Sequence, residues 1–141
     1  MSLESLVNYL ENHHLTNELI GRTNREERLI LTGATRTAKA LITSSLAKNN
    51  SKILLVIVPT LEDANRWFPL LKDCGWTKTC LYPTSEVSPY DSVQITSEIL
   101  WGQLQVLSDI FELKDNDNIA IVATERSLQP HLPPYQLLKS M

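Results

Sequence analysis

The sequence predicts an α/β fold in which a parallel sheet lies between helices, in three layers. Residues 53–58 and residues 119–123 are apolar at every position, which is typical of parallel strands covered on both faces. From residue 28 onward, such strands alternate with segments of helical periodicity, so right-handed crossovers are expected to join them. A third observation is a glycine-containing loop, residues 33–40, between a short apolar run and a helix.

The first 26 residues predict a helical segment that precedes an α/β region of residues 27–141. Four apolar residues at i, i+3, i+4 and i+7 predict an amphipathic helix: Leu3, Leu6, Val7 and Leu10. A second short helix is expected around residues 15–20. Residues 22–28 are polar and are expected to connect it to a strand at residues 28–32.

The next helix is predicted over about residues 37–48, because Asn49-Asn50-Ser51 is a natural stop. The apolar strand at residues 53–58 follows, and its continuous pattern places it in the middle of the sheet. Thr60 with Asp63 three residues later is typical of a helix N-cap, so a helix is predicted from there to about residue 73.

Residues 79–82 predict a third strand, and residues 83–92 a loop that contains Tyr90 and Asp91. Helical periodicity returns over residues 93–111, and the strand at residues 119–123 is expected to be covered on both faces. Thr124 is then placed to cap a last short helix.

Residues 33–40 resemble a phosphate-binding loop that lacks two of its chemical groups. Gly33 and Lys39 have the spacing of the Walker A motif, G-x-x-x-x-G-K-[ST]. Ala38 replaces the second glycine and adds a Cβ where backbone amides approach phosphate, and Ala40 replaces the hydroxyl that ligates Mg²⁺. The sequence thus predicts a partial P-loop NTPase or RecA-like lobe with a degenerate site, holding no nucleotide cofactor, no metal and no catalytic residue.

An ordinary strand-to-helix turn is the alternative interpretation of this loop, with Lys39 a solvated helix residue. In either case Arg36 is placed to hold an anion at the helix N-terminus, where unpaired amides favour negative charge. Glu125 follows the last strand, one residue late for a Mg²⁺-binding carboxylate, and is expected to begin a helix instead.

The remaining chemistry-bearing side chains are expected to be structural. Cys74 and Cys80 lack C-x-x-C spacing and matched histidines, which disfavours zinc and favours reduced thiols. The tryptophans are expected to pack in the core or between lobes rather than to stack on bases: Trp67, Trp76 and Trp101. The histidines have no partner at ligand spacing: His13, His14 and His131. The loop with Tyr90 and Asp91 is the surface feature expected to carry a role, although capping a helix is the plainer role for Asp91.

The bulk composition limits the class of protein. With 13 basic and 16 acidic residues the net charge is −3, so this chain alone is expected to bind nucleic acid weakly. The start of the chain lacks the cationic and apolar regions of a signal peptide, and its longest apolar run is too short to cross a bilayer. A soluble, cytoplasmic protein without membrane contact is therefore expected.

Several segments together resemble a known family. They are residues 31–34, residues 58–64, residues 81–86, residues 88–91 and residues 121–130. Their order and spacing are similar to the N-terminal region of the bacterial transcription-repair coupling factors (Mfd), especially the cyanobacterial ones. The resemblance extends from about Glu27 onward, and its most specific part is Ser88-Pro89-Tyr90-Asp91 before a long amphipathic helix.

The resemblance implies that the chain is an N-terminal fragment of a long multidomain protein, corresponding to the first sub-lobe of a module similar to the repair protein UvrB. The parent would be an ATP-dependent DNA translocase whose separate motor uses ATP and Mg²⁺. It would release RNA polymerase stalled at lesions on double-stranded DNA and recruit nucleotide excision repair through UvrA.

For the fragment itself, the resemblance implies a non-catalytic scaffold that packs on other domains of its own chain, and no residue is assigned to UvrA binding. Two alternatives stay open from the residues alone. One is a stand-alone P-loop nucleotide-binding protein with an altered loop, and the other is a small protein-interaction module.

Overall fold

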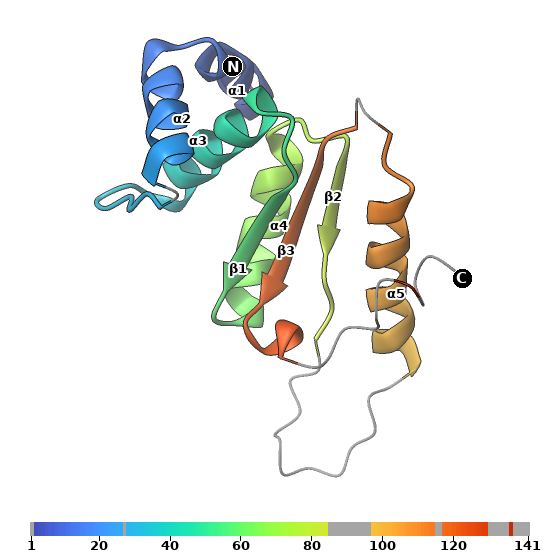
Figure 1. Ribbon diagram of the computed structural model, residues 1–141. Coiled ribbons are helices and arrows are strands. Elements are labelled where there is room, and N and C mark those ends of the chain that lie inside the picture. The colour runs from blue at the N-terminus through green and yellow to red at the C-terminus, as the bar shows by residue number, and fades with distance from the viewer. Residues whose placement is uncertain (1, 27, 85–96, 115–116, 130–135, 137–141) are drawn as a thin grey trace.

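The computed structural model describes residues 2–26, 28–84, 97–114, 117–129 and 136. The described elements are, in chain order, α1 (Leu3–Glu11), α2 (His14–Glu26), α3 (Arg36–Asn49), β1 (Leu54–Val58), α4 (Leu61–Asp73), β2 (Lys78–Leu81), α5 (Ser97–Phe111), β3 (Ile119–Thr124) and the 3₁₀ turn η1 (Arg126–Leu128). Figure 1 shows the three strands at the centre, α1 to α3 at one end of the sheet, and α4 and α5 along it.

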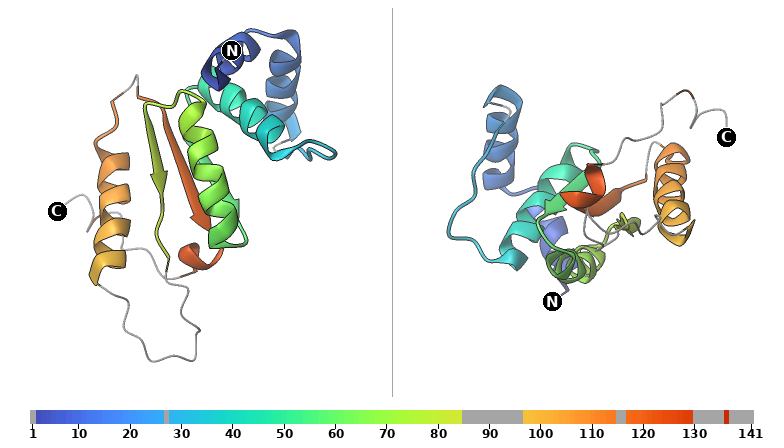
Figure 2. Two further views of the ribbon diagram at one scale, coloured as in Figure 1. Left: turned by 180° about the vertical axis from the view of Figure 1, so that it is seen from behind. Right: turned by 90° about the horizontal axis from the view of Figure 1, so that it is seen from below.

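The sheet is parallel, with strand order β1-β3-β2. Leu54 of β1 pairs with Ala120 of β3, and Lys78 of β2 pairs with Ile119. The chain passes through α4 between β1 and β2 and through α5 between β2 and β3. Figure 2 shows α4 over one face of the sheet and α5 on the side of β2. The predicted α/β fold, a parallel sheet flanked by helices, is confirmed.

Alternate residues of β3 divide the core into two clusters on opposite faces of the sheet. Ala120 and Val122 belong to the cluster on the α4 face, together with the buried Leu71 and Trp76. Ile121 and its odd-numbered neighbours belong to the cluster on the α5 face. All six residues of β3 are buried, so the prediction that this strand is covered on both faces is confirmed.

The α5-face cluster also contains Cys80 of β2, Tyr82 directly after β2, and Val106 of α5. At its edge, Lys78 Nζ lies 2.5 Å from Asp109 Oδ1, which joins β2 to α5. This ion pair and the apolar contacts place α5 over β2 and β3. In the views of Figures 1 and 2, α5 does not reach β1.

Helices α1 and α3 belong to the core on the α4 face. Val7 of α1 is fully buried in that cluster, and Asn49 Nδ2 of α3 donates to Glu11 O at 2.7 Å. The prediction that residues 22–28 form a connector is wrong, because α2 runs on to Glu26. A salt bridge between Arg22 and Glu18, 2.7 Å long, spans one turn of this polar helix.

The strand predicted at residues 28–32 is absent, because residues 28–35 form neither helix nor strand. Ile30 of this segment is 74% exposed. A strand needs a neighbour for its backbone hydrogen bonds, and β1 pairs only with β3 within the described part of the chain. Three apolar residues therefore do not make a strand here.

The placement of β1 in the middle of the sheet is also wrong. Within the described residues β1 is an edge strand, and its two α5-face side chains, Leu55 and Ile57, are 49% and 51% exposed. By contrast, the helix predicted after Thr60 is confirmed, since Thr60 Oγ1 accepts from Asp63 N at 3.1 Å. Of the predicted loop of residues 83–92, the part that contains Tyr90 and Asp91, residues 85–92, lies outside the described residues.

Candidate functional site

The turn before α3 depends on one glycine. Gly33 has a φ of +71°, a conformation that favours glycine over residues with a side chain. No atom lies within 4 Å of the position that a Cβ would take at this residue. Gly33 is therefore favoured for its backbone conformation, and not because a side chain at this position would meet a neighbour.

The amides that follow are used by the helix itself. Thr35 caps α3, and its Oγ1 accepts from Ala38 N at 3.2 Å. Lys39 N donates to Thr35 O at 2.9 Å. In a P-loop, backbone amides at the loop–helix junction cradle phosphate. Here those of Ala38 and Lys39 are already bonded to Thr35.

Ala40 points into the protein. It is fully buried in the core cluster on the α4 face, together with Val58 of β1 and Ala64 of α4. A P-loop carries at this position a hydroxyl that reaches a metal ion beside the nucleotide. A side chain at this position would instead face apolar groups, so the methyl of Ala40 fits its surroundings.

Arg36, the predicted anion-binding residue, contacts a carboxylate of its own chain. Its Nη2 lies 3.2 Å from Oδ1 of Asp63 in the first turn of α4. The other carboxylate oxygen of Asp63 accepts from Thr60 Oγ1 at 3.0 Å. The ion pair ties the beginning of α3 to the beginning of α4.

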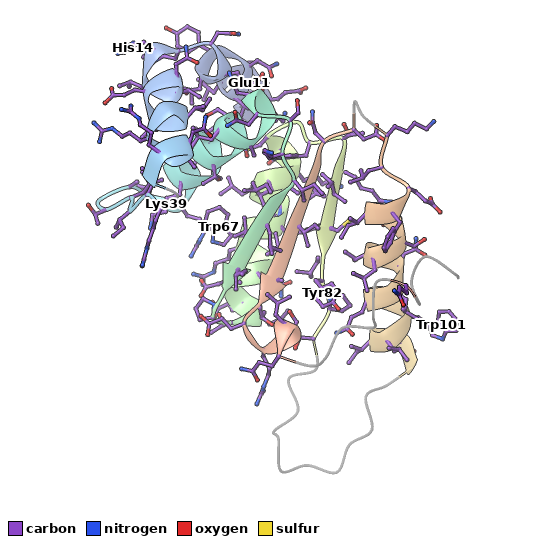
Figure 3. All side chains as sticks on the ribbon, viewed as in Figure 1. Glu11, His14, Lys39, Trp67, Tyr82 and Trp101 are labelled. Atoms are coloured by element: carbon purple, nitrogen blue, oxygen red, sulfur yellow. The ribbon has the colours of Figure 1, made fainter. Side chains whose placement is uncertain are left out.

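Lys39 is half-buried on α3, and Figure 3 shows its side chain extending from the lower end of that helix. Trp67, also labelled there, packs partly buried against the α4-face core. The four positions predicted to form a vestigial P-loop thus have separate surroundings. Gly33 and Lys39 border open space, Ala38 lies in the first turn of α3, and Ala40 is in the core.

The end of β3 forms a capped turn. Ser127 N donates to Thr124 Oγ1 at 3.2 Å, and Ser127 Oγ donates to Thr124 O at 2.7 Å. A short 3₁₀ turn, η1, therefore follows this strand, but its N-cap residue is Glu125, which makes no side-chain cap bond, so Thr124 stabilises the turn without being the predicted cap. Glu125 is exposed, and its amide donates to Val58 O at 3.0 Å. Within the described residues no group of three or more histidine, cysteine, aspartate or glutamate side chains is arranged to hold a metal ion.

The tryptophans divide between two environments. Trp76 is a core residue whose Nε1 donates to Ser44 Oγ at 3.1 Å, as predicted for structural packing. Trp101 is 68% exposed on α5, so it is not a core residue (Figure 3). Of the histidines, His13 Nδ1 accepts from Leu15 N at 3.3 Å and its ring contacts that of His14, whereas His131 lies outside the described residues.

Two polar clusters were not found from the sequence. Lys48 Nζ donates to Cys74 O at 2.9 Å and to Gly75 O at 2.7 Å, and lies 5.6 Å from the centre of the Trp76 ring. It thereby holds the turn between α4 and β2. A lysine in the last turn of a helix often bonds to a backbone carbonyl, so Lys48 itself was a signal. Its partner, Cys74 O, lies 26 residues away in the chain, and no local pattern identifies it.

The second cluster surrounds Asp109. The hydrogen-bonded Lys78 ammonium holds the pKa of Asp109 below its ordinary value, and Gln105 Nε2 adds a bond at 3.1 Å. Burial raises the pKa values of both Cys74 and Cys80, so these thiols stay protonated at neutral pH. Each cluster joins segments that are distant in the chain, and both stabilise the fold.

The fold defines the class of the protein: it is an α/β protein with a parallel sheet. A glycine turn precedes α3, a lysine follows at P-loop spacing within that helix, and Thr35 caps the helix. Over 100 residues, 71% of its length, the chain is 27% identical to the transcription-repair-coupling factor of Haemophilus influenzae. The similar region is 9% of that protein's length. No protein-family model and no solved structure matches the chain.

Over most of its length the chain is thus similar to a short region of a transcription-repair-coupling factor. In the described part of the chain, no helix is both long and apolar enough to span a membrane.

Proposed function

We propose that this chain is a non-catalytic scaffold portion of a transcription-repair coupling factor. The similarity to the Haemophilus influenzae factor supports the family context. In this proposal the complete protein is an ATP-dependent translocase that releases RNA polymerase stalled at DNA lesions and recruits UvrA. This region supports other domains of the same polypeptide in the cytoplasm.

The burial of Ala40 is the observation that carries the non-catalytic assignment. A nucleotide site of the P-loop kind needs a hydroxyl at that position to hold Mg²⁺ beside the phosphates. Ala40 has no exposed surface and contacts the apolar core. The bonds of Ala38 N and Lys39 N to Thr35 further reduce the number of donors left for phosphate.

Calorimetric titration of the 141-residue protein with ATP and Mg²⁺ tests the assignment directly. We expect no binding in the micromolar range and no release of phosphate. Micromolar affinity or measurable turnover would instead identify a stand-alone nucleotide-binding protein with an altered loop.

Grafting tests the family context. This chain replaces the similar region of the Haemophilus influenzae factor, and release of a stalled RNA polymerase is measured in vitro with ATP present. We expect the graft to retain activity, because a scaffold needs only the correct shape. An inactive graft whose Cys74 and Cys80 react rapidly with a maleimide would show that the region does not fold in that setting, and would contradict the proposal.

A further inference from the structure

The outer side of β1 carries exposed apolar side chains in the described structure. Three apolar side chains are each about half exposed here: Leu55 and Ile57 on one face of this short strand, and Ile53 directly before it. Their even-numbered neighbours Leu54, Val56 and Val58 pack into the α4-face core. One face of β1 thus packs against the core, with Val58 buried and Leu54 and Val56 partly buried, and the other face is about half exposed.

The open face continues an existing core. Leu55 pairs with Ile121 and Ile57 pairs with Ala123, and both β3 residues belong to the buried cluster beneath α5. Because paired residues of neighbouring strands point to the same face, Leu55 and Ile57 extend that apolar surface sideways. No described helix covers them, since α5 lies on the side of β2 (Figure 2).

The edge of β1 is open as well. In the described residues β1 has one strand neighbour, β3, so its other side presents backbone amides and carbonyls without a ladder partner. An exposed strand edge of this kind is a template for pairing with a further strand. The two open features meet at the same strand, which suggests one occupant for both.

We propose that β1 is the docking surface for a helix–strand unit, and this inference rests on the proposed function. The strand of this unit pairs in parallel with the outer edge of β1, and its apolar helix covers Leu55 and Ile57. The unit comes from the part of a coupling-factor polypeptide outside the region of similarity, which makes up most of the Haemophilus influenzae protein.

The handedness of the sheet supports this occupant. The step from β1 across to β2 carries its helix, α4, on one face, and the return step from β2 to β3 carries α5 on the other. A further step in the return direction, from β3 to a new strand outside β1, must also carry its helix on the α5 face to be right-handed. That is the face on which Leu55 and Ile57 are uncovered.

Two other occupants fit less well. Residues 28–32 precede α3, and α3 packs in the α4-face cluster through Ala40 and Leu41. Pairing of this segment with β1 would close the edge but leave the α5 face of β1 bare. A second copy, paired edge to edge through β1, would likewise bring no helix over Leu55 and Ile57.

Thiol accessibility in two settings tests the proposal. Ile57→Cys is introduced into the isolated 141-residue protein and into the same chain grafted into the Haemophilus influenzae factor, and the rate of maleimide labelling is measured. In the isolated protein the new thiol should label readily. In the graft it should label at least about tenfold more slowly, as for a thiol reached only through local opening.

Tyr9→Cys is the matched control, because Tyr9 is an exposed apolar residue, 68% exposed, away from β1. It should label at similar rates in both settings. Equal labelling of Ile57→Cys in both settings, with Cys74 and Cys80 protected, would overturn the docking surface while leaving the scaffold assignment intact. Rapid labelling of Cys74 and Cys80 in the graft would contradict the proposed function itself.

The isolated protein is also examined by sedimentation velocity. We expect a monomer. A dimer in which Ile57→Cys is protected, and which Ile57→Lys returns to a monomer, would assign the surface to a second copy and overturn the helix–strand unit.

Discussion

Restoring the Walker A motif should not restore nucleotide binding. The variant A38G/A40S would match G-x-x-x-x-G-K-[ST] at each defined position. We nevertheless expect no MgATP binding, because the segment before the loop is not a strand and the residue at position 40 faces the core. The motif works only where loop, strand and helix present their amides and hydroxyl to one site.

The double variant should also be less stable. Replacing Ala38 with glycine in the first turn of α3 costs up to about 1 kcal/mol through backbone entropy. A serine hydroxyl at the fully buried position 40 costs roughly 1–3 kcal/mol without a partner, and less if it bonds to the carbonyl one turn earlier. If the new serine hydroxyl bonds to that carbonyl in part of the molecules, the two substitutions together should lower the free energy of unfolding by about 1–3 kcal/mol.

Urea denaturation followed by tryptophan fluorescence measures the stability, and calorimetry measures MgATP binding. The single variants Ala38→Gly and Ala40→Ser separate the two contributions, and most of the loss should come from Ala40→Ser. Micromolar MgATP binding by the double variant, or a stability equal to that of the parent, would refute the conclusion that position 40 belongs to the core.

Three further predictions concern stability, and urea denaturation measures each. Leu71→Ala removes a fully buried side chain from the α4-face core and should cost about 2–5 kcal/mol; a loss below 1 kcal/mol would contradict that packing. Lys48→Met keeps the apolar stem but removes two hydrogen bonds to carbonyls, which should cost about 1–2 kcal/mol, whereas Lys52→Met at an exposed position should change little. Asp109→Asn should destabilise the protein at neutral pH. Because the folded pKa of Asp109 is lowered, the stabilising effect of this carboxylate is present above its unfolded pKa of about 3.9 and is lost as the pH falls through the folded pKa. The difference in stability between Asp109→Asn and the parent protein should therefore vanish in acid. A difference that is independent of pH would contradict the ion pair.

Much of the fold was predictable because its signals are local. The N-cap at Thr60 needs only Thr60 and Asp63, and the structure has that bond. The continuous apolar run of β3 predicts a strand covered on both faces, and all six residues are buried. Periodicity likewise predicted α1, α3 and α4 to within a few residues.

The failures have one physical cause. Residues 29–31 and β1 have the same apolar character as β3, yet the first is not a strand and the second lies at an edge. Apolar side chains show that a segment gains from being covered, but not whether a cover is present. Similarly, the motif spacing of residues 33–40 cannot reveal that Ala40 faces the core and that Thr35 binds the amide of Ala38.

By itself, the sequence determined the class of the fold, the order of most of its elements and the presence of alanine where a Walker A motif has its second glycine and its hydroxyl, because these depend on residue type and spacing along the chain. Only the tertiary structure decided which strand is central and that Arg36 contacts Asp63. It also decided that Leu55 and Ile57 remain half exposed. These features depend on contacts between segments distant in sequence, and no local pattern records which segments meet.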